Sequence, residues 1–390
     1  MPSNPRRNRW TAKFRKAVWR TVAALTGFGV ACFFVYLSIP VDESLTRAPD
    51  SGYLDMHVHT AGIGAGNSGA FINREMRENF RFSIYLGAFG VDAEELERRG
   101  DAVVIEKISG QVASSSRVDK AVVLALDGVV DADGALNREA TQIYVPNGFV
   151  ARETRRYPNL CFGASVNPRR RDALQRLRQA RAQGALLVKW IPNVMHIDPA
   201  DEANVRFYEE LVALDLPLLS HAGQERSFAS GRDAYGDPRR LALPLSIGVT
   251  VIAAHIGTTG TNEGEDNFER MLPMFARYPN LYADISALTQ INRTGLLAKA
   301  LAVPGLADRL VYGTDWPLQF FPLVSPGYHL NHIGVAAAKS IAVIDNAWDR
   351  DVALKEALGT PYRVFAKSAA LLDVNRCTVG KEAGIDAFSR

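Results

Sequence analysis

Residues 184–223 read GALLVKWIPNVMHIDPADEANVRFYEELVALDLPLLSHAG, and this stretch decides the fold. It opens with an apolar run (184–193), continues as a segment with apolar residues at helical spacing (201–215), and closes with a second apolar run (216–223). A strand, a helix and a strand in this order favour parallel strands joined by a right-handed crossover. The stretch therefore predicts one βαβ unit.

The same pattern repeats along most of the chain. Further apolar runs lie at residues 53–60, 120–128, 160–168, 250–257, 280–288 and 310–318. Helix-like segments between them include 172–183 and 267–279. Eight such strands in about 340 residues predict an α/β fold of the (β/α)8 TIM-barrel type. We expect the barrel at residues 53–372, with its largest insertion at 61–119 and a C-terminal tail at 373–390.

The N-terminal segment predicts a membrane anchor. Residues 1–20 hold seven Lys or Arg and no acid, and residues 21–41 hold no charged residue. A helix of about 20 apolar residues crosses a bilayer, whereas the apolar part of a cleaved signal peptide is only about 7–15 residues long. We expect a basic cytoplasmic leader (1–20), a transmembrane helix (21–41) and a linker (42–52). The positive-inside rule then places the barrel on the outer, periplasmic or extracellular, side.

Composition limits the remaining functions. With 47% hydrophobic and 22% charged residues, the 390-residue chain is globular. Its net charge of +3 comes from the leader, so the rest of the chain carries a net charge of about −4 and nucleic-acid binding has no support. Cys32, Cys161 and Cys377 are odd in number and far apart. We expect neither a disulfide framework nor a thiolate metal site.

Five polar residues stand at the predicted C-terminal ends of barrel strands, where barrel enzymes carry their chemistry. These residues are His57, His59, His221, His255 and Asp315. Each alone is often a satisfied core or rim residue. Together they predict a site for one divalent metal, with zinc favoured and Mn²⁺ or Fe²⁺ as alternatives, because imidazoles and a carboxylate suit these ions.

The spacing within residues 55–59 supports this interpretation. Side chains on a strand alternate between its two faces, so His57 and His59 both point into the barrel, about 7 Å apart along the strand. Asp55 is expected on the same face, two residues deeper. It either orients a ligand histidine or fills the barrel floor as a buried polar residue.

Four motifs carry a resemblance to a known family. DMHVH (55–59), LLSHAG (218–223), AAHIG (253–257) and YGTDWP (312–317), in this order, resemble the amidohydrolase superfamily. Within it they resemble the amidohydrolase-related branch that includes aminocarboxymuconate-semialdehyde decarboxylase and resorcylate decarboxylase. The resemblance implies that His57, His59, His221 and Asp315 bind one metal, usually zinc. It also implies that His255 stands beside the reacting water and that Asp315 doubles as the proton acceptor.

Further residues have weaker support. Lys189 lies on the strand from which binuclear members of the superfamily present a carboxylated lysine, but a structural or substrate-contacting role is favoured because the nearer branch is mononuclear. Arg169 and Arg170 either pair with an anionic substrate or belong to the solvated surface. Three residues near strand ends are candidates for lining the pocket: Asn193, Gln224 and Trp316.

The glycine-rich stretch GAGNSG (64–69) matches a dinucleotide-binding pattern, but that reading lacks support. Such a loop joins a strand directly to a helix within a βαβ unit of about 30 residues, and here the next strand begins about 60 residues later. We interpret the stretch as a flexible loop above the metal, part of a lid, or as a simple connection.

These features predict a membrane-anchored, metal-dependent hydrolase acting on a small molecule. Water activated by the metal attacks an ester, lactone or amide carbonyl, while Asp315 accepts the water proton and His255 holds or protonates the oxyanion. A metal-dependent decarboxylase acting on a carboxylate is the first alternative. A non-catalytic barrel that serves as a membrane scaffold is the second.

Overall fold

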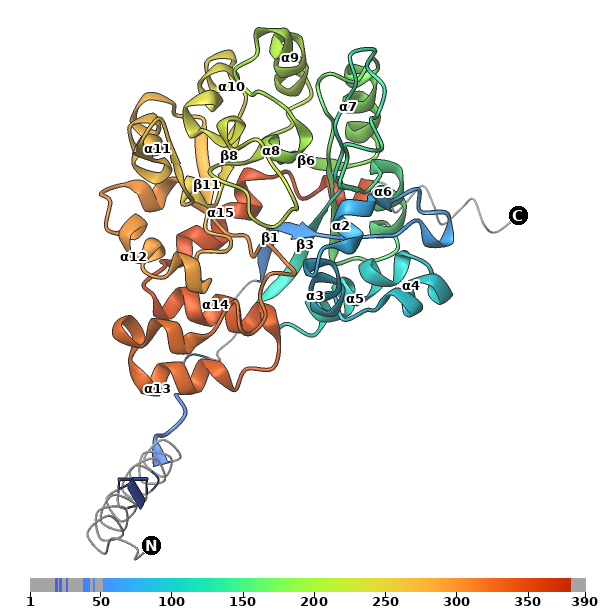
Figure 1. Ribbon diagram of the computed structural model, residues 1–390. Helices are drawn as coiled ribbons and strands as arrows, with labels where there is room; N and C mark the ends of the chain where they lie inside the picture. The colour runs from blue at the N-terminus through green and yellow to red at the C-terminus, as the bar shows by residue number, and fades with distance from the viewer. Residues whose placement is uncertain are drawn as a thin grey trace, which may run out of the picture.

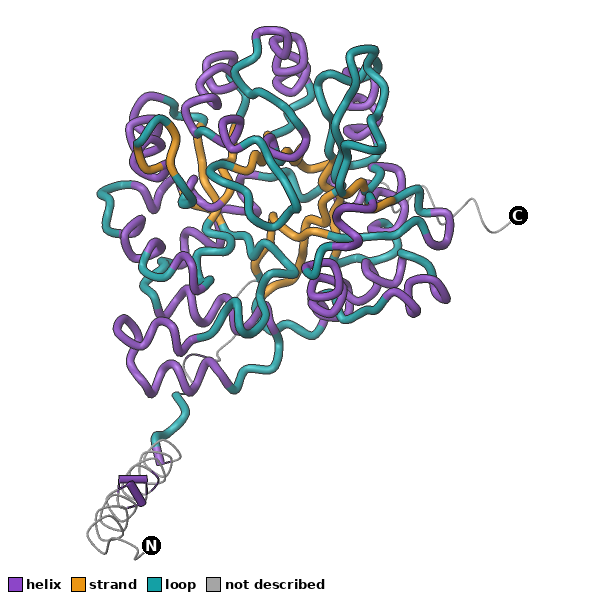
Figure 2. Tube along the Cα trace, in the orientation of Figure 1, coloured by secondary structure: helices purple, strands orange, loops and turns teal. Residues whose placement is uncertain are grey.

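The structure, a computed structural model, describes residues 52–379 and eleven isolated positions before them, namely 18, 19, 21, 22, 26, 38–42 and 45. Strands occupy the centre of the main body and helices surround them (Figures 1 and 2). Most of the predicted anchor at 21–41 lies outside the described residues, as does the end of the tail. Within the described part of the chain, no helix has the length and apolar character needed to cross a membrane.

The central sheet contains eight strands, and each of them lies within or overlaps a segment predicted from the sequence. In sheet order they are β1 (Tyr53–His59), β3 (Val118–Leu124), β5 (Leu160–Ala164), β6 (Ala185–Trp190), β7 (Leu218–His221), β8 (Val251–Ala254), β11 (Leu281–Asp284) and β12 (Leu310–Val311). All neighbouring pairs are parallel. The segment after β12 pairs with β1 through Val58 and Trp316, so the sheet closes as in a (β/α)8 barrel.

Helices follow most of the strands. The insertion after β1 contains α2 (Arg74–Glu78), α3 (Arg81–Ala88), α4 (Ala93–Arg99) and α5 (Ala102–Ala113). The crossovers contain α6 (Asn147–Thr154), α7 (Ala173–Ala182), α8 (Pro192–Met195), α9 (Val205–Ala213), α10 (Ala242–Ile247), α11 (Asn267–Arg277) and α12 (Leu296–Leu301). The chain ends with α13 (Leu330–Ala342), α14 (Ala347–Ala357), α15 (Tyr362–Leu371) and α16 (Arg376–Val379).

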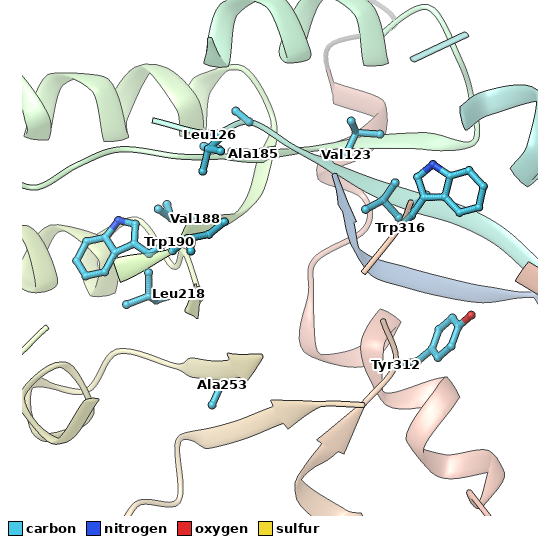
Figure 3. Close-up of a cluster of buried hydrophobic side chains, with 14 of the residues drawn as sticks. Val123, Leu126, Ala185, Val188, Trp190, Leu218, Ala253, Tyr312 and Trp316 are labelled. Carbon is cyan, nitrogen blue, oxygen red and sulfur yellow. The ribbon is translucent and has the colours of Figure 1, made fainter. Parts of the chain in front are cut away.

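The core forms because each strand presents apolar residues to the surrounding helices. Trp190 is fully buried and packs against Phe207 and Tyr208 of α9. Val188 and Leu218 belong to the same cluster, in which Figure 3 shows Trp190 beside them. Burying side chains of this size stabilises the fold by roughly 1.5–3 kcal/mol each. Residues of the same strands belong to two apolar clusters, so the strands are buried on both faces.

The cysteine expectation is wrong for one pair. Cys161 of β5 and Cys377 of α16 form a disulfide, with their Cα atoms 5.1 Å apart, although 216 residues separate them in sequence. Leu372 and Cys377 also belong to the apolar cluster that contains Leu54 and Met56. The beginning of the predicted tail (373–390) is therefore part of the packed structure, and sequence distance concealed this because only the closed barrel brings the two cysteines together.

Removing this disulfide should lower stability. A bond that closes so long a loop restricts the unfolded chain, so the Cys161→Ala, Cys377→Ala double variant should unfold with a free energy about 2–4 kcal/mol smaller than that of the wild type. Chemical denaturation under non-reducing conditions measures this difference. A reducing agent should bring the wild type to the stability of the variant, and equal stability of the two proteins without reductant would contradict the bond.

The glycine-rich loop is hydrogen-bonded to the insertion that follows it in sequence, an arrangement that favours a connection over a flexible lid. The Asp101 carboxylate accepts hydrogen bonds from the backbone N–H groups of Ile63 and Gly64 and from the Ser68 hydroxyl. Gly66, with φ of 65°, packs against the Cα of Gly100, where a side chain would have little room. The loop is thus attached to the segment between α4 and α5, and no dinucleotide-type helix follows it.

Candidate metal centre

Three side chains from the two segments that close the barrel converge on one point. His57 Nε2 lies 3.2 Å from His59 Nε2 and 3.3 Å from Asp315 Oδ1, and His59 Nε2 lies 3.1 Å from the same carboxylate oxygen. These three residues form a group whose ligand atoms are close enough to hold one metal ion. Two nitrogens and one oxygen are a donor set that suits a divalent transition metal.

Asp284, at the end of β11, orients His57. The imidazole donates from Nδ1 to Asp284 Oδ2 at 2.7 Å, because the buried carboxylate can only accept. This hydrogen bond fixes the tautomer, so that Nε2 presents its lone pair to His59 and Asp315. A carboxylate behind a histidine ligand is a common arrangement at metal sites and raises the basicity of the ligand nitrogen. The sequence-based site lacked Asp284, although it ends an apolar strand as His221 and His255 do.

Asp284 and Ser286 together position His255. The backbone N–H of His255 donates to Asp284 Oδ1 at 2.9 Å, and His255 Nδ1 lies 3.1 Å from the carbonyl oxygen and 2.8 Å from the hydroxyl of Ser286. Nδ1 is therefore the protonated nitrogen, and the bare Nε2 faces Asp315 Oδ2 at 4.0 Å. Both His255 and Asp315 have positive φ values, 58° and 65°, which non-glycine residues rarely adopt. Such strain is concentrated at functional sites.

His221, at the end of β7, supplies an unsatisfied nitrogen. Its Nδ1 lies 3.5 Å from Glu225 Oε2, whereas its buried Nε2 has no hydrogen-bond partner. Its ring is 5.3 Å from that of His255, although His221 does not belong to the tight group of His57, His59 and Asp315. A buried nitrogen without a partner is unfavourable. A bound cation would satisfy it, so the residues present fit the implied metal.

Lys189 of β6 is in the same centre. Its side chain is almost fully buried, and Nζ donates to His57 Nε2 at 2.9 Å. Burial lowers the pKa of this amine to about 8, while Asp315, Asp284 and Glu225 act in the opposite direction. A lysine of lowered pKa beside the ligands is compatible with the bridging role, because carboxylation needs the neutral amine. It is equally compatible with contacting the substrate, because the protonated amine is a hydrogen-bond donor.

Asp55 does not lie on the predicted face. Its carboxylate accepts from the backbone N–H groups of His57 and Thr314 and from the Trp348 indole of α14, outside the barrel. The register of β1 shifts between Asp55 and Val58, so the alternation of faces breaks there. Asp55 therefore contacts no ligand imidazole and instead joins the backbone of β1 to the segment after β12. Burial raises the pKa of Asp55 to about 6.

The two candidate arginines have other partners. The Arg170 guanidinium is buried and donates from Nη2 and Nε to Asp127. Arg169 is 60% exposed and lies 3.9 Å from Asp201. Neither residue lines the cavity at the metal centre, and their role as substrate contacts stays a prediction. The ion pair of Arg170 could not be predicted from local sequence patterns, because its partner Asp127 lies 43 residues earlier in the chain.

The three pocket-lining candidates are placed elsewhere as well. The Asn193 amide donates to Gly223 O and to Asp233 and thereby joins two loops. Gln224 accepts a hydrogen bond from Arg226. Trp316 stacks on Trp348, with ring centroids 4.3 Å apart. None of the three borders the cavity at the metal centre, so strand-end position alone did not identify its walls.

The cavity at the metal centre has a volume of about 110 Å³ and is lined by polar residues on one side and apolar residues on the other. His59, Lys189, His221, Glu225 and Asp315 form its polar side. The apolar side comes mainly from the insertion after β1, with Met76, Phe82, Leu86 and Phe89 as its main members. Tyr85 of α3 donates to Ser227 O at 3.0 Å and holds this insertion over the site. The sequence predicted the insertion but not that it encloses the centre.

The buried histidines should make the metal-free protein less stable in acid. Burial, with the charge of Lys189, lowers the pKa of His57 to about 4, against an ordinary value near 6.5. Between these values the unfolded chain binds a proton that the folded chain does not, so the free energy of unfolding falls as the pH drops from 6.5 to 4. His57 alone contributes up to about 3 kcal/mol to this fall. Burial lowers the pKa values of His221 and His255 too, whereas Asp55 acts with the opposite sign.

Urea unfolding of the metal-free protein at pH 7.5 and at pH 5 measures the effect. A His57→Asn variant removes the titrating group and should show a smaller difference between the two pH values. An equal difference in the variant and the wild type would mean that His57 does not carry the effect.

A (β/α)8 barrel whose strand ends carry histidines and an aspartate defines a class of barrel proteins with a candidate metal site where barrel enzymes carry their chemistry. The family model described as Amidohydrolase matches residues 117–323, more than half of the chain. The chain therefore belongs to the amidohydrolase family. The matched range excludes His57 and His59, so their assignment rests on geometry. The narrower decarboxylase-containing branch stays a prediction, and no curated protein matches the sequence.

Several solved structures are similar in overall arrangement. An uncharacterised TIM-barrel protein from Bordetella bronchiseptica is 16% identical, with a TM-score of 0.48, and 79% of this chain and 96% of that one are covered. A protein described as a 2-pyrone-4,6-dicarboxylic acid hydrolase from Pseudomonas putida is 15% identical (TM-score 0.48; 87% and 98% covered). 5-Carboxyvanillate decarboxylase from Sphingomonas paucimobilis is 13% identical (TM-score 0.41; 80% and 98% covered).

Proposed function

We propose that the protein is a metal-dependent hydrolase of small molecules that carry an ester, lactone or amide group. The convergence of His57 Nε2, His59 Nε2 and Asp315 Oδ1 within 3.3 Å, at the wall of a cavity, carries this proposal. His57, His59, His221 and Asp315 would hold one divalent ion, most readily zinc. A bound ion would supply Lewis acidity and lower the pKa of a coordinated water from about 15.7 toward about 7.

Asp315 is the proton acceptor in this proposal. Burial alone would raise its pKa, but His57, His59 and Lys189 hold the pKa below its ordinary value, so the group is a carboxylate at neutral pH. Oδ1 faces the histidines, and Oδ2 remains directed toward His255. One oxygen can thus face the metal ligands while the other receives the proton of the attacking water.

His255 receives a role different from the one expected from the sequence. Its Nδ1–H is engaged with Ser286, and burial keeps its pKa well below the ordinary value, so the imidazole is neutral with a bare Nε2. A bare nitrogen accepts a hydrogen bond and cannot donate one to an oxyanion. We therefore assign His255 to orienting the attacking water together with Asp315, while Lys189 is a hydrogen-bond donor at the same centre.

One experiment distinguishes the hydrolase from the two alternatives, the decarboxylase and the non-catalytic scaffold. Metal content is measured by elemental analysis of the purified protein, and esters, lactones, amides and aromatic carboxylates are screened for turnover. Release of an acid with an alcohol or amine supports the hydrolase, whereas release of CO₂ supports the decarboxylase. A protein without bound metal and without turnover, even after reconstitution with zinc, would leave the scaffold hypothesis in front.

We also propose that the barrel is tethered to the outer face of a membrane by residues 21–41. The uncharged run and the basic leader support this. The Cys161–Cys377 disulfide adds support, because such bonds persist in oxidising compartments. Ile39 O, near the end of the predicted transmembrane helix, accepts from Lys339, and Asp42 N–H, at the start of the linker, donates to Ser340. These described positions therefore lie against α13 (Figure 1). Deletion of residues 1–41 should release the protein from membranes, and continued membrane association would contradict the tether.

A further inference from the structure

One buried cation near the centre lacks a partner. Arg293 ends the short 3-10 helix at Ile291–Arg293, in the loop that follows β11. Its side chain is 8% exposed, and both Nε and Nη1 are buried without a hydrogen-bond acceptor. Within the described part of the chain it forms no ion pair. Two other buried arginines differ, since Arg170 pairs with Asp127 and Arg270 pairs with Asp237.

The position of Arg293 ties it to the metal centre. The strand that precedes it carries Asp284 and leads directly into Ser286, which together hold His57 and His255. Burial is the main cause of the lowered pKa values of His255 and His221, and the charge of Arg293 acts in the same direction on both. A guanidinium that is removed from water without an acceptor is unfavourable, so a residue of this kind is expected to have a partner that arrives with a ligand.

We propose that Arg293 receives a carboxylate group of the substrate. A carboxylate offers planar, charged acceptors that match the donors of a guanidinium. Arg293 does not line the cavity whose apolar wall comes from α2 and α3. The proposal therefore places the carboxylate outside that cavity and the apolar part of the substrate inside it. This inference rests on the proposed function and narrows it to an amphiphilic acid, with the reacting group between its two ends.

A rival explanation is that Arg293 only balances the charges of Asp315, Glu225 and Asp284, which act on it from a distance. The two explanations differ in what happens when the arginine is removed. If it serves as a charge balance, Arg293→Met lowers the melting temperature of the ligand-free protein. If it is a receptor without a partner, the melting temperature is unchanged or rises, and only ligand binding is lost.

The test compares benzoate with benzamide, which share a ring but differ in charge. Binding to the full-length protein is measured by calorimetry, once with the metal removed by a chelator and once with zinc. We expect the wild type to bind benzoate at least about tenfold more tightly than benzamide in both states, because charge-assisted hydrogen bonds are the stronger ones. In Arg293→Met this preference should disappear without a fall in melting temperature. The control Arg178→Met, at an exposed arginine paired with Glu210, should keep it.

Several results would overturn the inference. One is equal binding of the two compounds by the wild type, and another is a benzoate preference that survives in Arg293→Met. A third is a benzoate preference that needs zinc but does not need Arg293, because the carboxylate would then bind the ion. If Arg293→Met does not fold, Arg293→Lys is used in its place. We expect its preference for benzoate over benzamide to be at least about threefold smaller than that of the wild type, and full retention of the preference would contradict the role of Arg293. A preference that depends on Arg293 in a protein without ester or amide turnover would reject the hydrolase and keep the anion site.

Discussion

Replacing Asp315 by Asn should lower turnover by at least about 10³-fold, even where the protein remains folded. The amide is nearly the same size as the carboxylate, but it carries no charge and cannot accept the proton of the attacking water. Loss of a positioned general base costs about 10²–10⁴-fold. The effect should lie at the upper end of this range, because the same side chain also faces His57 and His59 and contributes to holding the ion.

The measurement is kcat with the best ester or amide found in the screen, at saturating zinc and with metal content determined for each sample. Asp308→Asn is a matched control, because the Asp308 side chain is 63% exposed and paired only with Arg363 at the surface. The control should keep the turnover of the wild type. If Asp315→Asn retained turnover with metal bound, the proton would have to go elsewhere, and Asp315 would lose its role as the base.

The second large effect is expected from replacing His57 and His59 together by Ala. Both imidazoles contribute nitrogens to the point where the ligand atoms converge, so the double variant should retain almost none of the roughly one ion per chain that we expect in the wild type. Turnover should fall with the metal content, and addition of zinc should not restore it. Elemental analysis after dialysis measures the change.

His332→Ala is the matched control, because His332 is an exposed histidine on α13, away from the cluster. A metal content near two ions per chain, reduced by Lys189→Ala, would instead place the protein among the binuclear members of its family. Metal content equal in the double variant and the wild type would reject this site for the ion.

Much of the fold could be predicted because each barrel strand is a short apolar run with its own pattern. Strand-end position also indicated that His57, His59 and Asp315 would lie close together, since position on a parallel strand determines the end of the barrel at which a side chain lies, whereas His221 lies outside this group. What could not be predicted depends on partners far apart in sequence. Asp284 holds His57 across 227 residues, and Arg170 is satisfied by an acid on another loop.

Local irregularities account for other errors. The register shift between Asp55 and Val58 reverses the face on which Asp55 lies, and a regular alternation cannot anticipate such a shift. Arg293 could not be told from any surface arginine, because its lack of a partner is a property of the folded surroundings. The apolar wall of the cavity was missed for a related reason, since α2 and α3 resemble ordinary amphipathic helices until their position over the strand ends is known.

The closing seam of the barrel has a consequence for how the site is assembled in time. His57 O accepts from Asp315 N–H and His59 N–H donates to Trp316 O, so the ligands meet only where the first and last strands join. More than 250 residues separate these segments, which corresponds to about 13–50 s of synthesis at 5–20 residues per second. The nascent chain therefore carries its paired histidines long before their partner exists. Ion loading becomes a late step of biogenesis, and the compartment in which the finished chain folds decides which ion it acquires.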